Sequence, residues 1–210
     1  MSAKLTKIHY LVDKYDSKKA EKKITKKANK MGYELQSLNR GVAHFTKNGD
    51  NYISVKGTNI FNPNDLISDY KLGLGFSNSD LQFRQRRNEI KKIYKNSTGD
   101  NYLVGHSLGA SIITNAMTKS KSIRDNTTQA VGYNTGYTKL FHNELKKDLS
   151  KTDRKEIKEK LKHYSASGDI ISNHLRTESV GDTIKIKTDK SNTLLQNHSL
   201  DNFNSLEEFG

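Results

Sequence analysis

Residues 105–109, Gly-His-Ser-Leu-Gly, are the part of the sequence best suited to covalent chemistry. Ser107 stands between two glycines, after the apolar stretch 101–104 and before a run of small and branched residues that begins at Leu108. A strand, a tight turn and a helix in that order expose a serine hydroxyl at the helix N-terminus, where it can attack an acyl carbon. Side chains at 105 and 109 would collide with the neighbouring strand and helix. The alternative is an ordinary glycine-rich turn, because Gly-x-Ser-x-Gly also arises by chance.

A serine nucleophile needs a general base, which we predict to be His198. When the serine stands on a strand–turn–helix motif, the acid and then the histidine follow it along the chain. His142 and His163 fall on or beside expected helices and strands, so we interpret them as surface or packing residues. His174 lies only five residues after Asp169, which would force carboxylate and imidazole onto one short loop. His198 follows the last expected strand in a late loop, where the base belongs.

Asp169 is the predicted partner of this base. It follows the expected strand 163–166 in the turn Ser-Gly-Asp, and active-site groups gather at the carboxyl ends of parallel strands. Asp182 is the next candidate, but it stands at the entry to a strand. The acidic residues of the preceding helices alternate with lysines and indicate solvated charge; they are Asp148, Asp153, Glu156 and Glu159. The alternative for Asp169 is a turn residue that bonds its own backbone.

The remaining requirement is a donor for the oxyanion of the tetrahedral intermediate. The backbone N–H of Leu108, at the start of the expected helix, can face that oxygen. This chemistry needs no metal ion or organic cofactor, and none is expected. The sequence contains no cysteine, which excludes thiolate catalysis, disulfides and cysteine-ligated zinc.

The elements that must position these residues alternate between strands and helices. Residues 17–31 are expected to form a helix, capped by Asp16 or Ser17 and ended at Gly32. The other expected elements, in chain order, are paired strands 41–47 and 51–56 joined through 48–50, helix 79–95, strand 101–104, helix 108–119, strand 129–133, helix 139–149, helix 153–161, strand 163–166 and strand 183–187. This alternation predicts an α/β fold, with a mainly parallel sheet and helices on both faces.

The length of 210 residues fits one domain with a sizeable core. We therefore expect a single domain over residues 1–210, with residues 1–32 as a basic helical segment packed on it. The N-terminus lacks the apolar stretch of a signal peptide, and no apolar run is long enough to span a bilayer. Together with the absence of cysteine, this leads us to expect a soluble protein in an intracellular or otherwise non-classical location.

The net charge of +13, from 36 Lys and Arg against 23 Asp and Glu, favours anionic partners. Seven lysines fill one half of the circumference of the expected helix 17–31, at positions 18, 19, 22, 23, 26, 27 and 30. Its opposite stripe, which we expect to pack on the core, consists of Ala20, Ile24, Ala28 and Met31. The lysines fit a phospholipid surface, nucleic acid, or a merely solvated face. Nucleic acid is not expected, because no aromatic residues interleave with the lysines for base stacking.

From residue 52 to residue 203 the chain resembles the class 3 lipases, a branch of the α/β-hydrolases. Four pieces carry the resemblance in the family's order: 55–58 (Val-Lys-Gly-Thr) followed by 65–69 (Asp-Leu-Ile-Ser-Asp), 105–110 (Gly-His-Ser-Leu-Gly-Ala), 167–171 (Ser-Gly-Asp-Ile-Ile) and 197–203 (Asn-His-Ser-Leu-Asp-Asn-Phe). The resemblance implies an α/β-hydrolase fold with Ser107, Asp169 and His198 as the catalytic triad. It also implies that Thr58 supplies a second oxyanion donor through its backbone N–H.

The chain departs from the family pattern at several positions. Lys56 stands where the family usually has Arg, and Leu66 where it usually has Trp. The stretch in the lid position, 59–64, is short, which leaves either a minimal lid or control of lipid access by 72–76. None of these departures removes a catalytic group, so they bear on the substrate more than on the chemistry.

These observations predict a carboxylic ester hydrolase that acts on acyl lipids. The basic surface favours phospholipase A1-like activity on anionic phospholipid over hydrolysis of neutral triglyceride. One alternative is a soluble esterase or thioesterase on the same fold, because fold and triad do not separate these activities. Another is a non-catalytic lipase-like protein with a structural or nucleic-acid-binding role.

Overall fold

The computed structural model describes residues 2–57, 77–136, 145, 147, 149–169, 172, 180–189 and 191–206. Its strands are β1 (Glu34–Leu38), β2 (Val42–Lys47), β3 (Asp50–Val55), β4 (Asn101–His106), β5 (Gln129–Tyr133), β6 (Leu161–Ala166) and β7 (Asp182–Ile186). Its helices are α1 (Ser2–His9), η1 (Tyr10–Asp13), α2 (Ser17–Asn29), α4 (Ser77–Lys95), α5 (Leu108–Lys119), α6 (Lys121–Asn126), α8 (Lys151–Lys160), α10 (Leu194–His198) and η2 (Leu200–Phe203), of which η1 and η2 are 3₁₀ turns.

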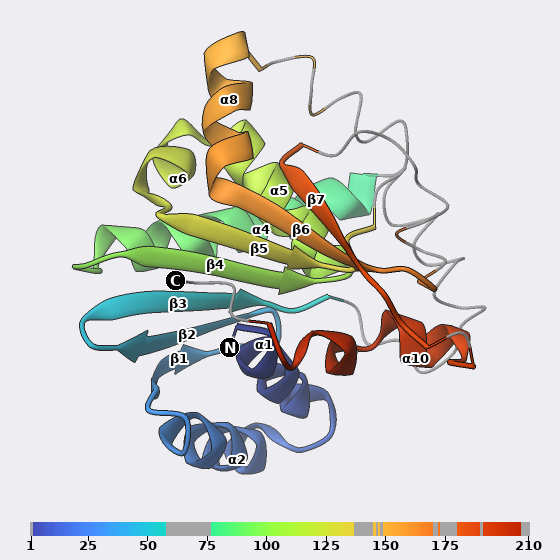
Figure 1. Ribbon diagram of the computed structural model, residues 1–210. Helices are drawn as coiled ribbons and strands as arrows, with labels where there is room; N and C mark the ends of the chain where they lie inside the picture. The colour runs from blue at the N-terminus through green and yellow to red at the C-terminus, as the bar shows by residue number, and fades with distance from the viewer. Residues whose placement is uncertain are drawn as a thin grey trace.

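In the described part of the chain the strands form one seven-stranded sheet, whose order follows the sequence from β1 to β7 (Figure 1). β1, β2 and β3 pair antiparallel, and β3 to β7 pair parallel. The turn between β2 and β3 holds Asn48 and Gly49 at φ of 54° and 86°, as expected for an Asn-Gly hairpin. The structure thus confirms the predicted α/β architecture with a mainly parallel sheet.

One face of the sheet is covered by the helices that connect the parallel strands. Phe83 of α4, Ile112 of α5 and Ile157 of α8 lie in a single apolar core with Ile53 of β3 and Leu103 of β4. Strands that are added in sequence order through right-handed crossovers receive all their connecting helices on the same face. The opposite face therefore has to be covered by other parts of the chain.

The two ends of the chain cover that opposite face. Ala3 of α1 and Phe203 of η2 pack together with Val131 of β5, while Ile24 of α2 packs with Phe45 of β2. Figure 1 accordingly shows the N-terminus beside the returning C-terminal segment. The predicted helices on both faces are confirmed, and the basic N-terminal segment is part of the fold rather than an appendage.

The helix α2 has the predicted orientation. Asp16 caps its N-terminus by accepting a hydrogen bond from the backbone N–H of Lys19 at 2.9 Å, and Gly32 follows its end at a φ of 77°. Its apolar stripe, which is buried, consists of Ala20, Ile24 and Ala28. The lysines consequently point away from the sheet, as the sequence indicated.

Several elements were not expected from the sequence: α1, η1, β1, α6 and α10. Each is short, and short elements form through tertiary packing rather than through their own propensity. The expected helix 139–149 lies almost wholly outside the described residues, of which it includes only 145, 147 and 149.

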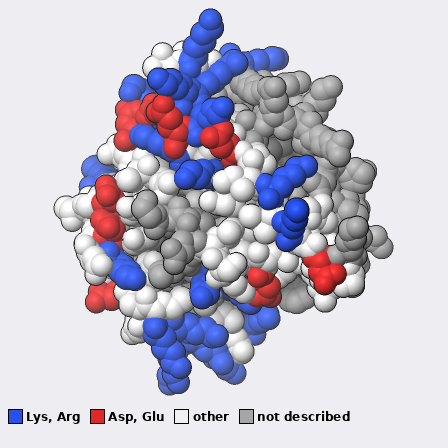
Figure 2. Space-filling view, viewed as in Figure 1, with Lys and Arg blue, Asp and Glu red and all other residues white. Residues whose placement is uncertain are grey.

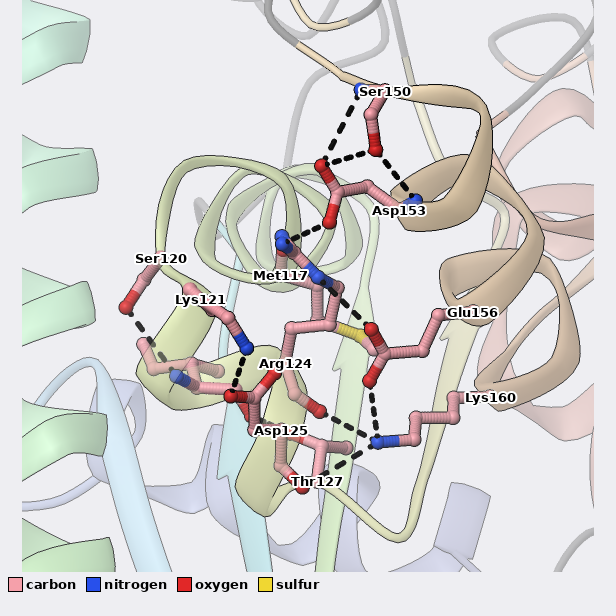
Figure 3. Close-up of polar contacts among 11 residues, drawn as sticks. Met117, Ser120, Lys121, Arg124, Asp125, Thr127, Ser150, Asp153, Glu156 and Lys160 are labelled. Atoms are coloured by element: carbon pink, nitrogen blue, oxygen red, sulfur yellow. Dashed lines mark hydrogen bonds and ion pairs between the residues drawn. The ribbon is translucent and has the colours of Figure 1, made fainter.

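A buried cation, Arg124, joins α6 to α8 on the face of the sheet that is covered by the connecting helices (Figure 3). Arg124 is 4% exposed and contacts Asp153 at 2.5 Å and Glu156 at 3.3 Å. It also donates to the carbonyl of Met117, and Lys160 completes the network by pairing with Glu156 at 2.9 Å. The expectation that Asp153 and Glu156 are solvated charges was therefore wrong, because the sequence did not show that Arg124 is buried beside them.

We expect Arg124→Met to lower the midpoint of thermal unfolding by several degrees, because it leaves two partly buried carboxylates without their shared cation. The matched control is Lys121→Met, which removes the exposed i,i+4 pair with Asp125 on the same helix. Such a pair contributes little, so the control should unfold close to the wild type. Calorimetry of both variants measures the difference, and equal midpoints would contradict a stabilising role for the network.

Candidate active site

Ser107 lies in a strained turn between β4 and α5. Its φ of 55° and ψ of −123° fall where a residue with a Cβ is disfavoured, and such strain persists only where the surrounding structure enforces it. The backbone N–H of Ser107 donates to the carbonyl of Tyr133 on β5 at 2.9 Å, which fixes the turn to the neighbouring strand. The nucleophile candidate thus occupies the predicted strand–turn–helix junction.

The glycines around Ser107 are required by crowding, as predicted. A Cβ on Gly105 would lie 2.6 Å from the carbonyl of Gly109, and a Cβ on Gly109 would lie 2.1 Å from the carbonyl oxygen of Val55. Gly57, two residues after the end of β3, is also crowded, since a Cβ there would lie 2.7 Å from the carbonyl oxygen of His106 and 3.1 Å from the amide nitrogen of Leu108. Gly57 therefore lies beside Leu108, whose backbone N–H is the predicted oxyanion donor.

Several predictions fall outside the described residues. They concern Thr58, the lid position 59–64, the acidic segment 65–69, the alternative access segment 72–76, His142 and His174. The second oxyanion donor and the lid accordingly remain predictions.

Asp169 and His198 form a buried pair, as predicted. The Nδ1 atom of His198 lies 2.9 Å from Oδ1 of Asp169, and the two residues are 5% and 1% exposed. The second carboxylate oxygen accepts hydrogen bonds from Ser172, at 3.2 Å from its backbone N–H and 2.7 Å from its hydroxyl. Burial alone would raise the pKa of Asp169, but the hydrogen bonds from His198 and Ser172 outweigh it and lower the pKa.

This pairing determines which nitrogen of His198 can act as a base. An ionised Asp169 only accepts hydrogen bonds, so Nδ1 of His198 carries the proton and Nε2 of the neutral ring is a free acceptor. That is the tautomer a general base needs when it removes a proton from a hydroxyl.

Two buried polar atoms at this site have no hydrogen-bond partner among the described residues. They are the Oγ of Ser107 and the Nε2 of His198. The ring of His198 packs 4.8 Å from the ring of His106, the residue directly before Ser107. Unpartnered buried polar atoms are rare, and catalytic hydrogen bonds often tighten only when substrate binds. A donor and an acceptor with no other partner thus lie in neighbouring parts of one site.

The setting of His198 differs from the prediction in one respect. His198 is the last residue of the short helix α10 instead of lying in a loop. Thr193 and Gln196 form a capping box at the start of this helix. The spacing of these two residues is the signal that sequence reasoning missed.

Sequence reasoning also missed Asn134, which links the acid turn to the base. It is fully buried, has a φ of 44°, and follows β5 directly. Its side chain accepts from the backbone N–H of Ala166 at 2.9 Å and donates to the carbonyl of Asn197 at 3.1 Å. One side chain therefore holds the end of β6, just before Asp169, to the residue before His198.

The other candidates lie elsewhere. His163 is 2% exposed and is held by Thr135 at 2.8 Å and the carbonyl of Val180 at 2.9 Å, and burial lowers its pKa to about 4. It is a packing residue, as expected. Asp182 lies 3.4 Å from Lys158 on the surface, and both side chains are more than half exposed. Neither belongs to the site around Ser107.

The described residues contain neither a cluster of metal ligands nor a helix that could span a membrane. Among them, no three His, Asp or Glu side chains converge as a metal site. Within the same part of the chain, no helix combines the length and apolarity needed to cross a bilayer.

Comparisons with known proteins found no protein-family model and no curated protein that matches the chain. The resemblance to class 3 lipases therefore rests on the motifs and their order along the sequence.

Proposed function

We propose that this protein is a serine hydrolase of the α/β-hydrolase type that cleaves the carboxylic esters of acyl lipids. The observation that carries the proposal is the strained Ser107 at the β4–α5 turn, whose buried hydroxyl has no partner among the described residues and whose neighbour His106 packs on the His198 of the Asp169–His198 pair. A merely structural turn would explain neither the strain nor the unpartnered atoms.

The proposed reaction has two halves. In the first, Oγ of Ser107 attacks the ester carbonyl carbon while its proton passes to Nε2 of His198. Asp169 stabilises the resulting imidazolium, and the N–H groups of Leu108 and Thr58 stabilise the oxyanion. The bond from carbon to the alcohol oxygen then breaks, and His198 returns the proton to that oxygen. In the second half, water attacks the acyl-enzyme with His198 again as base, which releases the carboxylic acid and restores Ser107.

The charge distribution supports an anionic lipid substrate. We define the lysine face as six exposed residues on α2 and at its C-cap: Lys18, Lys19, Lys22, Lys26, Lys27 and Lys30. Within the described part of the chain, the lysine face forms no ion pair. On α8, by contrast, Lys155 pairs with Glu159 and Lys158 with Asp182. Figure 2 shows blue side chains gathered at the bottom of the molecule, over α2, whereas blue and red are mixed at the top, over α8.

Replacing Lys18, Lys22, Lys26 and Lys30 with glutamine should weaken binding to phosphatidylglycerol vesicles by more than tenfold at low salt. Each basic residue near an anionic surface contributes up to about 1 kcal/mol. The difference should shrink at high salt, since the Debye length falls from about 10 Å at 0.1 M to about 3 Å at 1 M. Vesicle co-sedimentation across a salt series measures both effects.

The matched control removes the same charge from the other end of the molecule, with glutamine at Lys147, Lys151, Lys155 and Lys158. It should bind vesicles nearly as the wild type does, and both variants should hydrolyse a soluble short-chain ester at the wild-type rate. Equal binding by all three proteins would make the lysine face a solvated surface. Tighter binding to duplex DNA than to vesicles would favour the nucleic-acid alternative.

The substrate proposal is tested by hydrolysis itself. The enzyme is offered phosphatidylglycerol vesicles and, separately, a soluble butyrate ester, and released acid is titrated. We expect faster release from the vesicles. Activity confined to the soluble ester would favour the soluble esterase alternative, and no acid from either substrate would contradict the hydrolase proposal.

A further inference from the structure

Tyr10 of η1 connects two parts of the candidate site that are far apart in sequence. Its hydroxyl oxygen accepts a hydrogen bond from the backbone N–H of Gly57 at 3.3 Å. The same hydroxyl lies 3.0 Å from Nδ1 of His106. On the other side of that ring, Nε2 of His106 lies 2.8 Å from the carbonyl oxygen of His198. A chain of three contacts thus runs from the end of β3 to the predicted base.

The direction of each hydrogen bond among Gly57, Tyr10, His106 and His198 follows from the groups that can only donate or only accept. The carbonyl of His198 can only accept, so Nε2 of His106 carries a proton and donates it. The ring is neutral because burial, with the nearby His198 as a secondary cause, lowers the pKa of His106 to about 3. Nδ1 of a neutral ring protonated at Nε2 can only accept, so Tyr10 donates to it. Burial also raises the pKa of Tyr10, which keeps this donor protonated.

The charge state of His106 matters for its neighbour. The centres of the His106 and His198 rings are 4.8 Å apart. In the proposed reaction His198 becomes a cation, and a second cation at that distance would oppose the proton transfer. A neutral His106 avoids this repulsion, and the Tyr10 hydroxyl, as the donor to Nδ1, stabilises the tautomer whose Nε2 donates to the carbonyl of His198.

Tyr10 is itself fixed by a buried ion pair. Lys56 lies with its Nζ 5.3 Å from the centre of the Tyr10 ring and contacts the carboxylate oxygens of Asp13 at 2.7 and 2.9 Å. Lys56 and Asp13 are 8% and 14% exposed. Lys56, which stands where class 3 lipases usually have Arg, therefore anchors the N-terminal segment beside the site.

We propose that Tyr10 is a positioning residue. Through His106 it holds the helix α10, which ends in the predicted base His198. Through Gly57 it holds the segment after β3, which precedes the predicted oxyanion donor Thr58 in the sequence. This inference rests on the proposed function for its catalytic consequence. The N-terminal segment then contributes to the reaction without touching the substrate, because Tyr10 acts through His106 and Gly57.

The test is a double-mutant cycle with Tyr10→Phe and His106→Phe, assayed on a soluble short-chain ester. Phenylalanine at position 10 keeps the ring and removes only the hydroxyl. We expect Tyr10→Phe to lower kcat about tenfold with little change in KM, because it removes the hydroxyl that accepts from Gly57 and donates to His106. The double variant should be slower than His106→Phe by less than the loss that Tyr10→Phe causes alone, because both changes interrupt the contact between Tyr10 and His106 and only Tyr10→Phe interrupts the contact with Gly57. Tyr15→Phe, on the same segment and outside the chain of contacts, is the matched control and should keep the wild-type kcat.

A second measurement needs no substrate. The ¹⁵N shifts of the imidazole nitrogens should show His106 neutral and protonated at Nε2 in the wild type, and a changed Nδ1 shift in Tyr10→Phe, because that nitrogen loses its hydrogen-bond donor. If the wild type hydrolyses no ester but the shifts change as expected, the proposed function fails while the contact chain stands. Wild-type kcat in Tyr10→Phe, losses that multiply in the double variant, or an unchanged Nδ1 shift of His106 would each overturn the positioning role.

Discussion

Ser107→Ala is expected to lower ester hydrolysis by at least roughly 10⁴-fold while the protein stays folded. The variant loses the only atom that the proposed reaction uses to form the acyl-enzyme. It keeps the Cβ, so the backbone strain at a φ of 55° is unchanged. Removing a buried hydroxyl that has no hydrogen-bond partner among the described residues should leave the midpoint of thermal unfolding equal to that of the wild type or slightly higher.

The matched control for this variant is Ser111→Ala, one turn further along α5. Ser111 is also buried, but its hydroxyl donates to the carbonyl of Gly136. We expect this variant to lose stability and keep its turnover number. Undiminished hydrolysis by a folded Ser107→Ala protein would contradict the central claim.

His198→Ala should be nearly as damaging as the loss of the serine, because the proposed reaction passes the proton of Ser107 to Nε2 of His198. Residues that act as a unit give non-additive losses, so the double variant with Ser107→Ala should be scarcely slower than either single variant. Steady-state kinetics on a soluble ester, with circular dichroism to verify folding, measure these effects.

The comparison variant is His174→Ala, which should have a mild effect. His174 is the alternative base that the sequence leaves open near Asp169. Asp169 already makes its hydrogen bond with His198 at 2.9 Å. If His174→Ala proved severe and His198→Ala mild, the assignment of the base would be wrong.

Much of the fold could be predicted because the parallel strands and their helices carry local signals. The helix α5 begins and ends where its run of small and branched residues does, and β5 matches the expected strand 129–133. The Asn-Gly turn defined the β2–β3 hairpin through residues that tolerate positive φ. In these cases the local preference and the tertiary structure agree.

The elements that the sequence did not reveal depend on long-range packing. α1 is short and interrupted by lysines, and it forms where Ala3 and Leu5 are buried against the sheet. Its partner on that face, η2, lies at the other end of the chain, so no local window contains both. The burial of Arg124 between α6 and α8 was hidden for the same reason.

The site divides in the same way. The strand–turn–helix setting of Ser107 and the pairing of Asp169 with His198 could be predicted, because their motifs and their order along the chain constrain them. The residues that hold them could not, because Tyr10, His106 and Asn134 act through contacts between distant segments. Their side-chain types have many ordinary roles in folded proteins, and only the structure identifies these contacts.

The most direct test of the account is covalent labelling of the wild-type protein with a fluorophosphonate probe, followed by peptide mass spectrometry. Such a probe reacts with a serine only when a base activates it and donors stabilise the charge on the phosphoryl oxygen. We expect one adduct per chain, on Ser107, and no adduct in Ser107→Ala or His198→Ala. Labelling of a different residue, or no labelling of the folded wild-type protein, would contradict it.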